Sequence, residues 1–212
     1  MTVPPGEDPV GVIRDHLMNL VRAKVREAGH ELAVEERRLL DVRDLSVFAD
    51  GVFDAVVAYG GPISYAFEQA ETALAECIRV TRTRGVVLAS VMATIGTMRY
   101  FLPAVVDEIE AFGADVTDTV IHTGDLRHTH ATGHRCRMFR WREIAEMIER
   151  QPGRLLAASA SNATSLGDPE ALDRLAADPD VWARFLRWEE ELAQEPGALD
   201  GGTHILFGVE RA

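Results

Sequence analysis

The sequence lacks the features that mark several classes of protein. It contains no apolar run of about 18 residues, so no transmembrane helix is predicted. Its first residues, MTVPPGEDPVG, lack the basic and apolar regions of a signal peptide. Its two cysteines, Cys77 and Cys136, lie far apart and form no pair motif. No G-x-G triplet occurs, which weakens every dinucleotide-binding interpretation. We therefore expect a protein of a reducing, cytoplasmic compartment.

Basic residues are also in short supply. The chain has 22 Lys and Arg against 34 Asp and Glu, a formal net charge of −12. Nucleic-acid binding depends on clustered Lys and Arg, so neither nucleic acid nor membrane is an expected partner. Its 212 residues, of which 47% are hydrophobic, suffice for one globular domain with a full core. We predict a single domain over 1–212, with 1–9 as an irregular lead-in.

The most informative stretch runs from residue 53 to residue 92. Residues 55–59 are apolar in succession, which predicts a strand buried on both faces, and Gly60-Gly61-Pro62 ends it. A helix should follow and end at Gly85, and residues 86–89 predict a second doubly buried strand. The inner face of this helix is marked by residues that recur at three- and four-residue spacing: Phe67, Ala70, Leu74, Cys77, Ile78 and Thr81. Strand, helix and strand predict a βαβ unit in a parallel sheet, with a ligand beyond the strand ends at 59–65.

Weaker patterns predict further elements on either side. Before the central unit we expect a weak strand at 10–13, a helix over 17–28 closed by Gly29, and a strand at 32–34. After it we expect helices at 102–112, at 140–150, from Pro169 and from Asp180, and strands at 155–158 and 203–209. The last strand should be antiparallel. Residues 115–137, rich in His and Thr, predict a mixture of strand and loop. Three aromatic residues are expected in the core: Trp182, Phe185 and Trp188.

Several segments resemble a known family when they are taken in order. They are DVRDL, FDAVVAYGGPISY, AECIRVTRTRGVVLASV, RMFRWREIAEMIER with LLAASAS, and the terminal THILFGVER. Their order is similar to that of the class I S-adenosylmethionine-dependent methyltransferases over roughly residues 10–160. The resemblance implies an α/β fold, a Rossmann-like three-layer sandwich with a mostly parallel sheet and an antiparallel last strand. It also implies S-adenosyl-L-methionine as the cofactor.

One departure from the family concerns the start of the chain. The family's first strand and glycine-rich loop should precede Val10, and the acidic residue that holds the ribose is represented at best by Asp15. The missing strand lies at the centre of the family's sheet, so its loss would leave open strand edges. We expect an N-terminally truncated or degenerate copy, with a rebuilt fold, such as a homodimer supplying the missing edge, as the alternative.

The resemblance also implies where the cofactor would bind. Asp41 would accept a hydrogen bond from the adenine amino group, and the backbone at Val42 would lie against the ring. Tyr59, Gly60 and Gly61 would line the methionine end. Tyr65 would touch the substrate. The alternatives stay open: a solvated turn aspartate, a plain strand-to-helix turn, and an aromatic residue packed at a helix start.

The histidine-rich segment offers candidates for proton transfer. Residues 115–137 are expected to form a lid or substrate loop, in which His128 or His130 would act as general base because histidine titrates near neutral pH. Metal binding by His122, His128, His130, His134 and Cys136 is disfavoured, since no acidic or Cys-x-x-Cys partner completes a tetrahedral set. We expect a methyltransferase that acts on a small molecule, impaired by the missing loop. The alternatives are a non-catalytic remnant that acts through oligomerisation or a protein partner, and another nucleotide-binding α/β enzyme.

Overall fold

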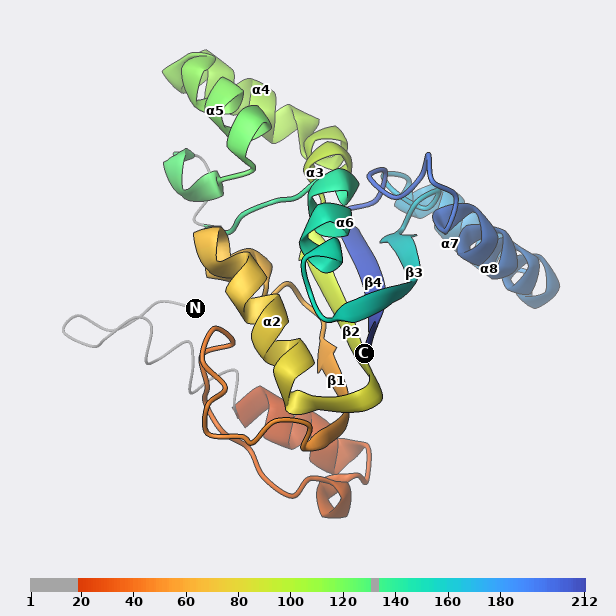
Figure 1. Ribbon diagram of the computed structural model, residues 1–212. Helices are drawn as coiled ribbons and strands as arrows, with labels where there is room; N and C mark the ends of the chain where they lie inside the picture. Colours follow the sequence, from red (N-terminus) through yellow and green to blue (C-terminus); the bar gives the residue numbers. More distant parts are fainter. Residues whose placement is uncertain (1–18, 131–133) are drawn as a thin grey trace. The chain divides into compact units, whose positions relative to one another are not determined.

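The computed structural model describes residues 19–130 and 134–212 (Figure 1). The chain divides into two compact units, Met1–Leu40 and Asp41–Ala212, and each is described by itself. The predicted single domain over 1–212 stays a prediction. The lead-in at 1–9, the strand at 10–13 and Asp15 lie outside the described residues.

The described part of the first unit is helical. Residues 19–27 form a helix, as predicted, and Gly29 follows with a φ of +70°. The strand predicted at 32–34 is wrong, because Glu31–Ala33 forms a 3₁₀ helix, η1. Its turns are closed locally: Ala33 N donates to His30 O at 3.0 Å, and Val34 N donates to Glu31 O. Leu32 is exposed, and the short apolar run at 32–34 is therefore not part of a sheet.

The second unit is built on a four-stranded sheet formed by the described residues. Its strands are β1 (Phe53–Ala58), β2 (Thr81–Met92), β3 (Gly153–Ser161) and β4 (His204–Arg211), in the order β1-β2-β4-β3. β1 and β2 are parallel, and β4 is antiparallel to both β2 and β3. Three strands therefore run in one direction and the last strand runs against them. The predicted α/β class, parallel central unit and antiparallel last strand are confirmed.

The helix between β1 and β2 ends earlier than predicted. η2 (Ser64–Gln69) leads into α2 (Ala70–Val80), and the chain becomes extended at Thr81. Gly85 is therefore not the helix cap. A Cβ at Gly85 would lie 2.6 Å from the Asp54 carbonyl oxygen, so this glycine permits close approach of β2 to β1. The β1–β2 register also shifts there, between Phe53 and Ala55.

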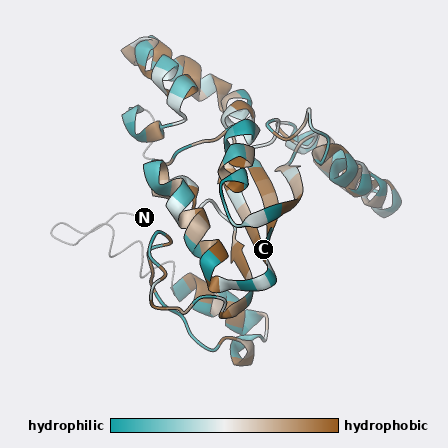
Figure 2. Ribbon diagram, viewed as in Figure 1, coloured by the Kyte–Doolittle hydropathy of each residue, from teal (hydrophilic) through white to brown (hydrophobic). Residues whose placement is uncertain are grey.

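One face of the sheet is covered by helices α2 and α6 (Trp141–Glu149) (Figure 1). Ala58, Ala89 and Phe207 are register neighbours on this face, and all three are buried. Figure 2 shows that the strands carry mostly apolar residues. The helices contribute eight further buried side chains to the same cluster: Ala70, Ala73, Leu74, Cys77, Ile78, Ile144, Met147 and Ile148. This cluster is the core of the second unit.

The other face of the sheet leaves apolar side chains exposed. Val57 pairs with Leu88, and the side chains of Leu88 and Leu156 both lie beside Gly208. Val57 is 63% exposed and Leu156 42%. The expectation that β1 and β2 are buried on both faces is therefore wrong. We call Val57, Leu88 and Leu156 the open face.

Three helices follow β2 before the chain returns to the sheet. They are α3 (Thr94–Tyr100), α4 (Leu102–Phe112) and α5 (Asp115–Thr123), followed by the 3₁₀ turn η3 (Leu126–His128). α4 was predicted, with its end at Gly113. The loop-and-strand reading of 115–123 is wrong, because its threonines hydrogen-bond within a helix. Thr123 Oγ1 donates to Thr119 O at 2.7 Å, and Thr119 Oγ1 donates to Asp115 O.

The last two helices, α7 (Pro169–Ala176) and α8 (Pro179–Ala193), pair with each other beside β3 (Figure 1). Asp168 caps α7 by accepting from Ala171 N, and Asp178 caps α8, two residues before the predicted start at Asp180. The core placement of Trp188 is wrong, since its side chain is exposed; Trp182 and Phe185 are half-buried and stack on each other. Among the described residues, no helix has the length and hydropathy that crossing a bilayer requires.

Candidate functional site

The turn after β1 presents its backbone to the surroundings. Gly60 and Gly61 have φ values of +82° and +81°, which favour glycine. Gly60 N donates to the Ser90 hydroxyl at 3.1 Å, which fixes the turn to β2. A Cβ at Gly60 would meet no atom within 4 Å. The carboxyl end of β1 therefore offers an accessible peptide surface where the sequence predicts the methionine end of the cofactor.

In the segment predicted to hold adenine, charged side chains bind one another. Asp41 accepts from Arg43 Nε at 2.8 Å and from Arg43 N at 2.9 Å, and these hydrogen bonds lower the pKa of the Asp41 carboxyl to about 2. Val42 packs against the core, and Leu45 N donates to Glu76 on α2. An adenine amino group at Asp41 would therefore share the carboxylate with Arg43.

A buried serine joins the segments around the strand ends. Ser64 Oγ accepts from Met92 N at 2.9 Å, and Ser64 O accepts from Arg137 N at 2.9 Å. The returning chain pairs with the end of β2, since Phe139 N donates to Met92 O and Thr94 N donates to Phe139 O. The turn after β1, the end of β2 and residues 137–139 are thereby held side by side.

Tyr65 connects the glycine turn to a histidine. Its backbone N donates to Gly61 O at 3.2 Å, and its hydroxyl lies 3.4 Å from His134 Nε2. His134 Nε2 in turn lies 3.4 Å from Met92 Sδ. Burial, with a smaller contribution from Cys136, raises the pKa of the Tyr65 phenol, so this hydroxyl stays neutral at neutral pH. A continuous row of contacts thus runs from the turn to the end of β2.

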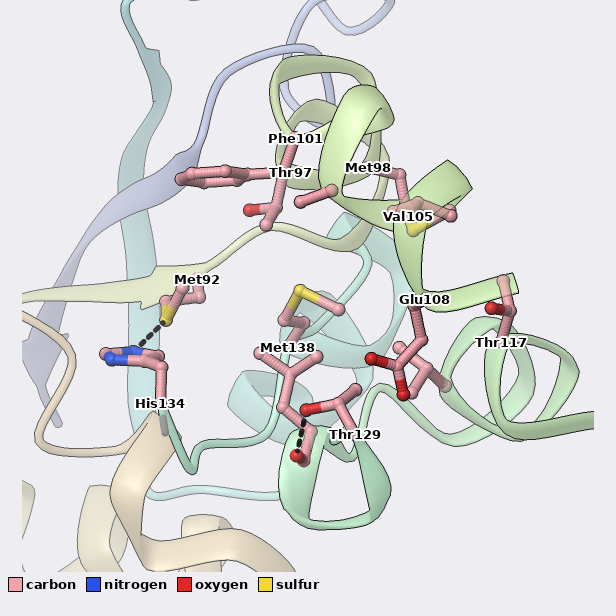
Figure 3. Close-up of a pocket in the computed structure, with 13 residues that line it drawn as sticks. Met92, Thr97, Met98, Phe101, Val105, Glu108, Thr117, Thr129, His134 and Met138 are labelled. Atoms are coloured by element: carbon pink, nitrogen blue, oxygen red, sulfur yellow. Dashed lines mark hydrogen bonds between the residues drawn. The ribbon is translucent and has the colours of Figure 1, made fainter. Parts of the chain in front are cut away.

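A cavity of about 360 Å³ opens at that end of β2, under α3, α4 and α5 (Figure 3). Met92 and His134 lie at one end of it, and Glu108 and Thr117 at the other (Figure 3). Most of the wall is apolar: Met92, Met98, Phe101, Ala104, Val105, Val120, Leu126 and Met138. We call this cavity the apolar pocket. A second cavity of about 460 Å³ shares Met92, Thr97 and Phe101 with it.

The structure separates the histidines of the predicted lid. His130 is tied to Glu108, whose Oε1 accepts from His130 N at 2.8 Å and lies 3.0 Å from His130 Nδ1. The His130 ring also stacks on Phe112 with centroids 4.2 Å apart. His128 is exposed, 3.9 Å from an Asp125 carboxylate oxygen. Among the described lining residues of the apolar pocket, the histidine is His134.

Sequence reasoning missed two residues of this region. Glu108 is buried although charged, and its spacing from Val105 on α4 would have put it on the inner stripe. His204 lines the second cavity, and burial, with a smaller effect from His134, lowers its pKa. No short-range pattern marks His204, because β4 reaches the site only through the sheet.

Within 19–130 and 134–212, no three His, Cys, Asp or Glu side chains lie close enough to hold a metal ion. His122 instead lies 2.6 Å from the Asp118 carbonyl oxygen, and burial raises the pKa of the Cys136 thiol to about 12. The thiol is therefore protonated at neutral pH.

Residues 13–89 match the family model described as the methyltransferase domain, which confirms the predicted resemblance to methyltransferases for that part of the chain. The match includes both segments predicted to bind the cofactor and ends within β2. No curated protein matches the chain.

Solved structures with a similar fold share little sequence with this chain. The [4+2]-cyclase SpnF is 16% identical, with a TM-score of 0.48 over 90% of this chain and 60% of its own. Geranyl diphosphate C-methyltransferase from Streptomyces coelicolor A3(2) is 14% identical, with a TM-score of 0.46 over 90% and 57%. A SAM-dependent methyltransferase from Methanosarcina mazei is 8% identical, with a TM-score of 0.47 over 82% of this chain and 66% of its own. The chain thus spans about 60% of the length of the first of these.

Proposed function

We propose that this chain is an S-adenosylmethionine-dependent methyltransferase that acts on a small molecule in the cytoplasm. The observation that carries the proposal is the row of contacts from Gly61 through Tyr65 and His134 to Met92, which joins the predicted cofactor turn to the apolar pocket. The match of 13–89 to the methyltransferase domain supports the cofactor side. Cys77 and Cys136 are both unpaired and buried, which fits a reducing compartment.

The residues around the turn fit one end of the cofactor. The open space at Gly60 would admit a ligand against the backbone of Tyr59, Gly60 and Gly61, and Asp41 with Val42 would hold the adenine. When bound, S-adenosylmethionine supplies an activated methyl group on its sulfonium. The sequence carries no G-x-G loop, so we propose weaker cofactor binding than an intact loop would give.

The protein's part in methyl transfer is to position the acceptor and exclude water. The walls of the apolar pocket serve both purposes, and Tyr65 would contact the acceptor near the turn. A hydroxyl or amine acceptor must also lose a proton. We propose His128 or His130 for that role. His134, at the Met92 end of the apolar pocket, is a third candidate.

Calorimetric titration of S-adenosylhomocysteine into the full chain tests the cofactor site. We expect micromolar binding, weakened at least tenfold by Gly60→Ala. The matched control is Gly113→Ala, because Gly113 also has a positive φ, +86°, with open space at its Cβ. A cooperatively folded chain that binds no S-adenosylhomocysteine would remove the proposal.

The three histidines are then separated by single substitutions. His134→Ala should lower turnover most, and His128→Ala least, because His128 points to Asp125. His130→Ala should change turnover through the loss of the contact between the His130 ring and Glu108. Turnover equal to that of the parent in all three variants would exclude these histidines as the proton acceptor.

A second function is favoured by the edge of the sheet. β1 is an end strand among the described residues, and the open face beside it is apolar. Unpaired edges and exposed apolar patches promote association. We therefore keep a non-catalytic remnant, acting as a homodimer or with a protein partner, as the alternative. The mass of the chain in solution, measured with the titration above, distinguishes the two.

A further inference from the structure

The composition of the apolar pocket restricts what can occupy it. Its volume, about 360 Å³, falls in the range of small-molecule sites, roughly 300–1,000 Å³. Three methionine side chains, Met92, Met98 and Met138, lie on its walls, and methionine adapts to irregular ligands. The pocket therefore has the size and the surface for one largely apolar molecule.

Several polar groups of the walls are hydrogen-bonded to the protein. Thr129 Oγ1 donates to Leu126 O at 2.9 Å, and Thr97 Oγ1 donates to Thr203 O at 3.4 Å. Glu108 Oε1 accepts from His130 N. Figure 3 shows Thr129 bonded away from the cavity and Glu108 at its far end. Hydrogen bonding thus contributes little along most of the cavity, and apolar contact dominates.

The charges of the lining residues further restrict which ligands the apolar pocket can bind. No Lys or Arg occurs among the described residues that line the pocket, and the charged side chain there is the carboxylate of Glu108. A phosphate or carboxylate group would meet neither Lys nor Arg on these walls and would lie near a negative charge at the Glu108 end, which costs free energy. The lining therefore disfavours anionic ligands.

We infer that the apolar pocket binds an uncharged, largely apolar small molecule, and that this molecule is the methyl acceptor. The second half of the inference rests on the proposed function, since His134 and Met92, at one end of the pocket, are connected through Tyr65 to the predicted cofactor turn. The reacting atom of the acceptor would lie at that end, and its apolar body would extend toward Val105 and Val120.

A ligand series with one ring system and three head groups tests the inference. N-phenyl-1-naphthylamine, an uncharged fluorescent probe, is bound to the full chain and displaced with 2-naphthol, 2-naphthylmethylamine or 2-naphthyl phosphate. We expect 2-naphthol to displace the probe at a concentration at least tenfold lower than either charged compound. Equal or better displacement by the phosphate or the amine would overturn the inference.

Two substitutions locate the binding. Ala104→Trp should fill the pocket and weaken probe binding at least tenfold, whereas Ala183→Trp, on the exposed surface of α8, should leave it unchanged. Met98→Lys places a cation on the wall and should turn the preference toward 2-naphthyl phosphate. Thermal melts establish that each variant is folded. Unchanged probe binding in a folded Ala104→Trp, or no change of preference in a folded Met98→Lys, would overturn the inference.

Calorimetry with S-adenosylhomocysteine separates the two proposals. Cofactor binding without 2-naphthol binding would overturn the acceptor class and leave the methyltransferase. Binding of 2-naphthol without the cofactor would overturn the acceptor role and the proposed function together, leaving an apolar binding site.

Discussion

The two faces of the sheet in Asp41–Ala212 carry similar residues but have different surroundings. Val87 and Leu88 are neighbours on β2, yet Val87 is fully buried under the helices while Leu88 belongs to the open face. On β1, Val56 pairs with Val87 and lies on the covered face, whereas Val57 pairs with Leu88 and lies on the open face. Local sequence thus determines that a strand forms, and the elements packed around it determine which face is buried.

The largest expected effect comes from truncating the same residue type against each face. Leu74→Ala removes a fully buried side chain of α2 and should lower the free energy of unfolding by about 2–5 kcal/mol. Leu156→Ala on the open face should cost less than about 1 kcal/mol. Urea denaturation of both variants measures the difference. Equal losses would mean that the open face is covered in solution.

A smaller, pH-dependent effect is expected on the outer side of α2, the helix over the covered face. Glu76 accepts from Arg79 Nε at 2.6 Å and from Leu45 N at 2.7 Å. The hydrogen bond from Arg79 lowers the pKa of Glu76. Because the folded-state pKa is lowered, this contribution is present above about pH 4.5 and is lost as the pH falls through the lowered value.

Glu76→Gln should therefore cost about 1–2 kcal/mol at pH 7 and progressively less in acid. Denaturation at several pH values measures this. Glu110→Gln, at an exposed position of α4, is the control and should cost less than about 0.5 kcal/mol at pH 7. A cost for Glu76→Gln that persists at pH 2 would contradict the ionic origin.

The smallest expected effect on stability comes from charging the open face. The double variant Val57→Lys with Leu88→Glu puts opposite charges on paired positions and should unfold within about 0.5 kcal/mol of the parent. It should also associate less, because a large exposed apolar patch is removed. Sedimentation over a range of concentrations measures this, with Leu186→Lys on α8 as control. Identical masses for parent and double variant would rule out the open face as an interface.

The sequence was sufficient for the central βαβ unit, because continuous apolar runs and a 3.6-residue stripe depend on neighbours along the chain. It was insufficient for the helix at Asp115–Thr123, since β-branched threonines and valines weaken the helical pattern that long-range packing of Val120 restores. It also misjudged the end of α2, because Gly85 serves a contact with Asp54, a residue 31 positions earlier.

The candidate site divides in the same way. The turn at Gly60-Gly61 could be predicted, because glycines directly after a buried strand have a local signature. The apolar pocket could not, since its walls come from β2, α3, α4, α5 and the segment before Phe139, which meet only in three dimensions. The choice among His128, His130 and His134 depended on their contacts in three dimensions. Glu108 lies 22 positions from His130 and Tyr65 lies 69 positions from His134, so no local pattern in the sequence reports these two contacts.

The pairing of Thr94 with Phe139 has a consequence for how this protein could change over time. The chain leaves the sheet at Thr94 and returns at Phe139, and these two residues are hydrogen-bonded at 2.9 Å. Everything between them, including most of the pocket wall, is an excursion with adjacent ends. Because the cost of closing such a loop grows only slowly with its length, the excursion can be lengthened, shortened or exchanged without moving the sheet. The fold thus keeps its frame constant and confines variation in ligand preference to one replaceable segment.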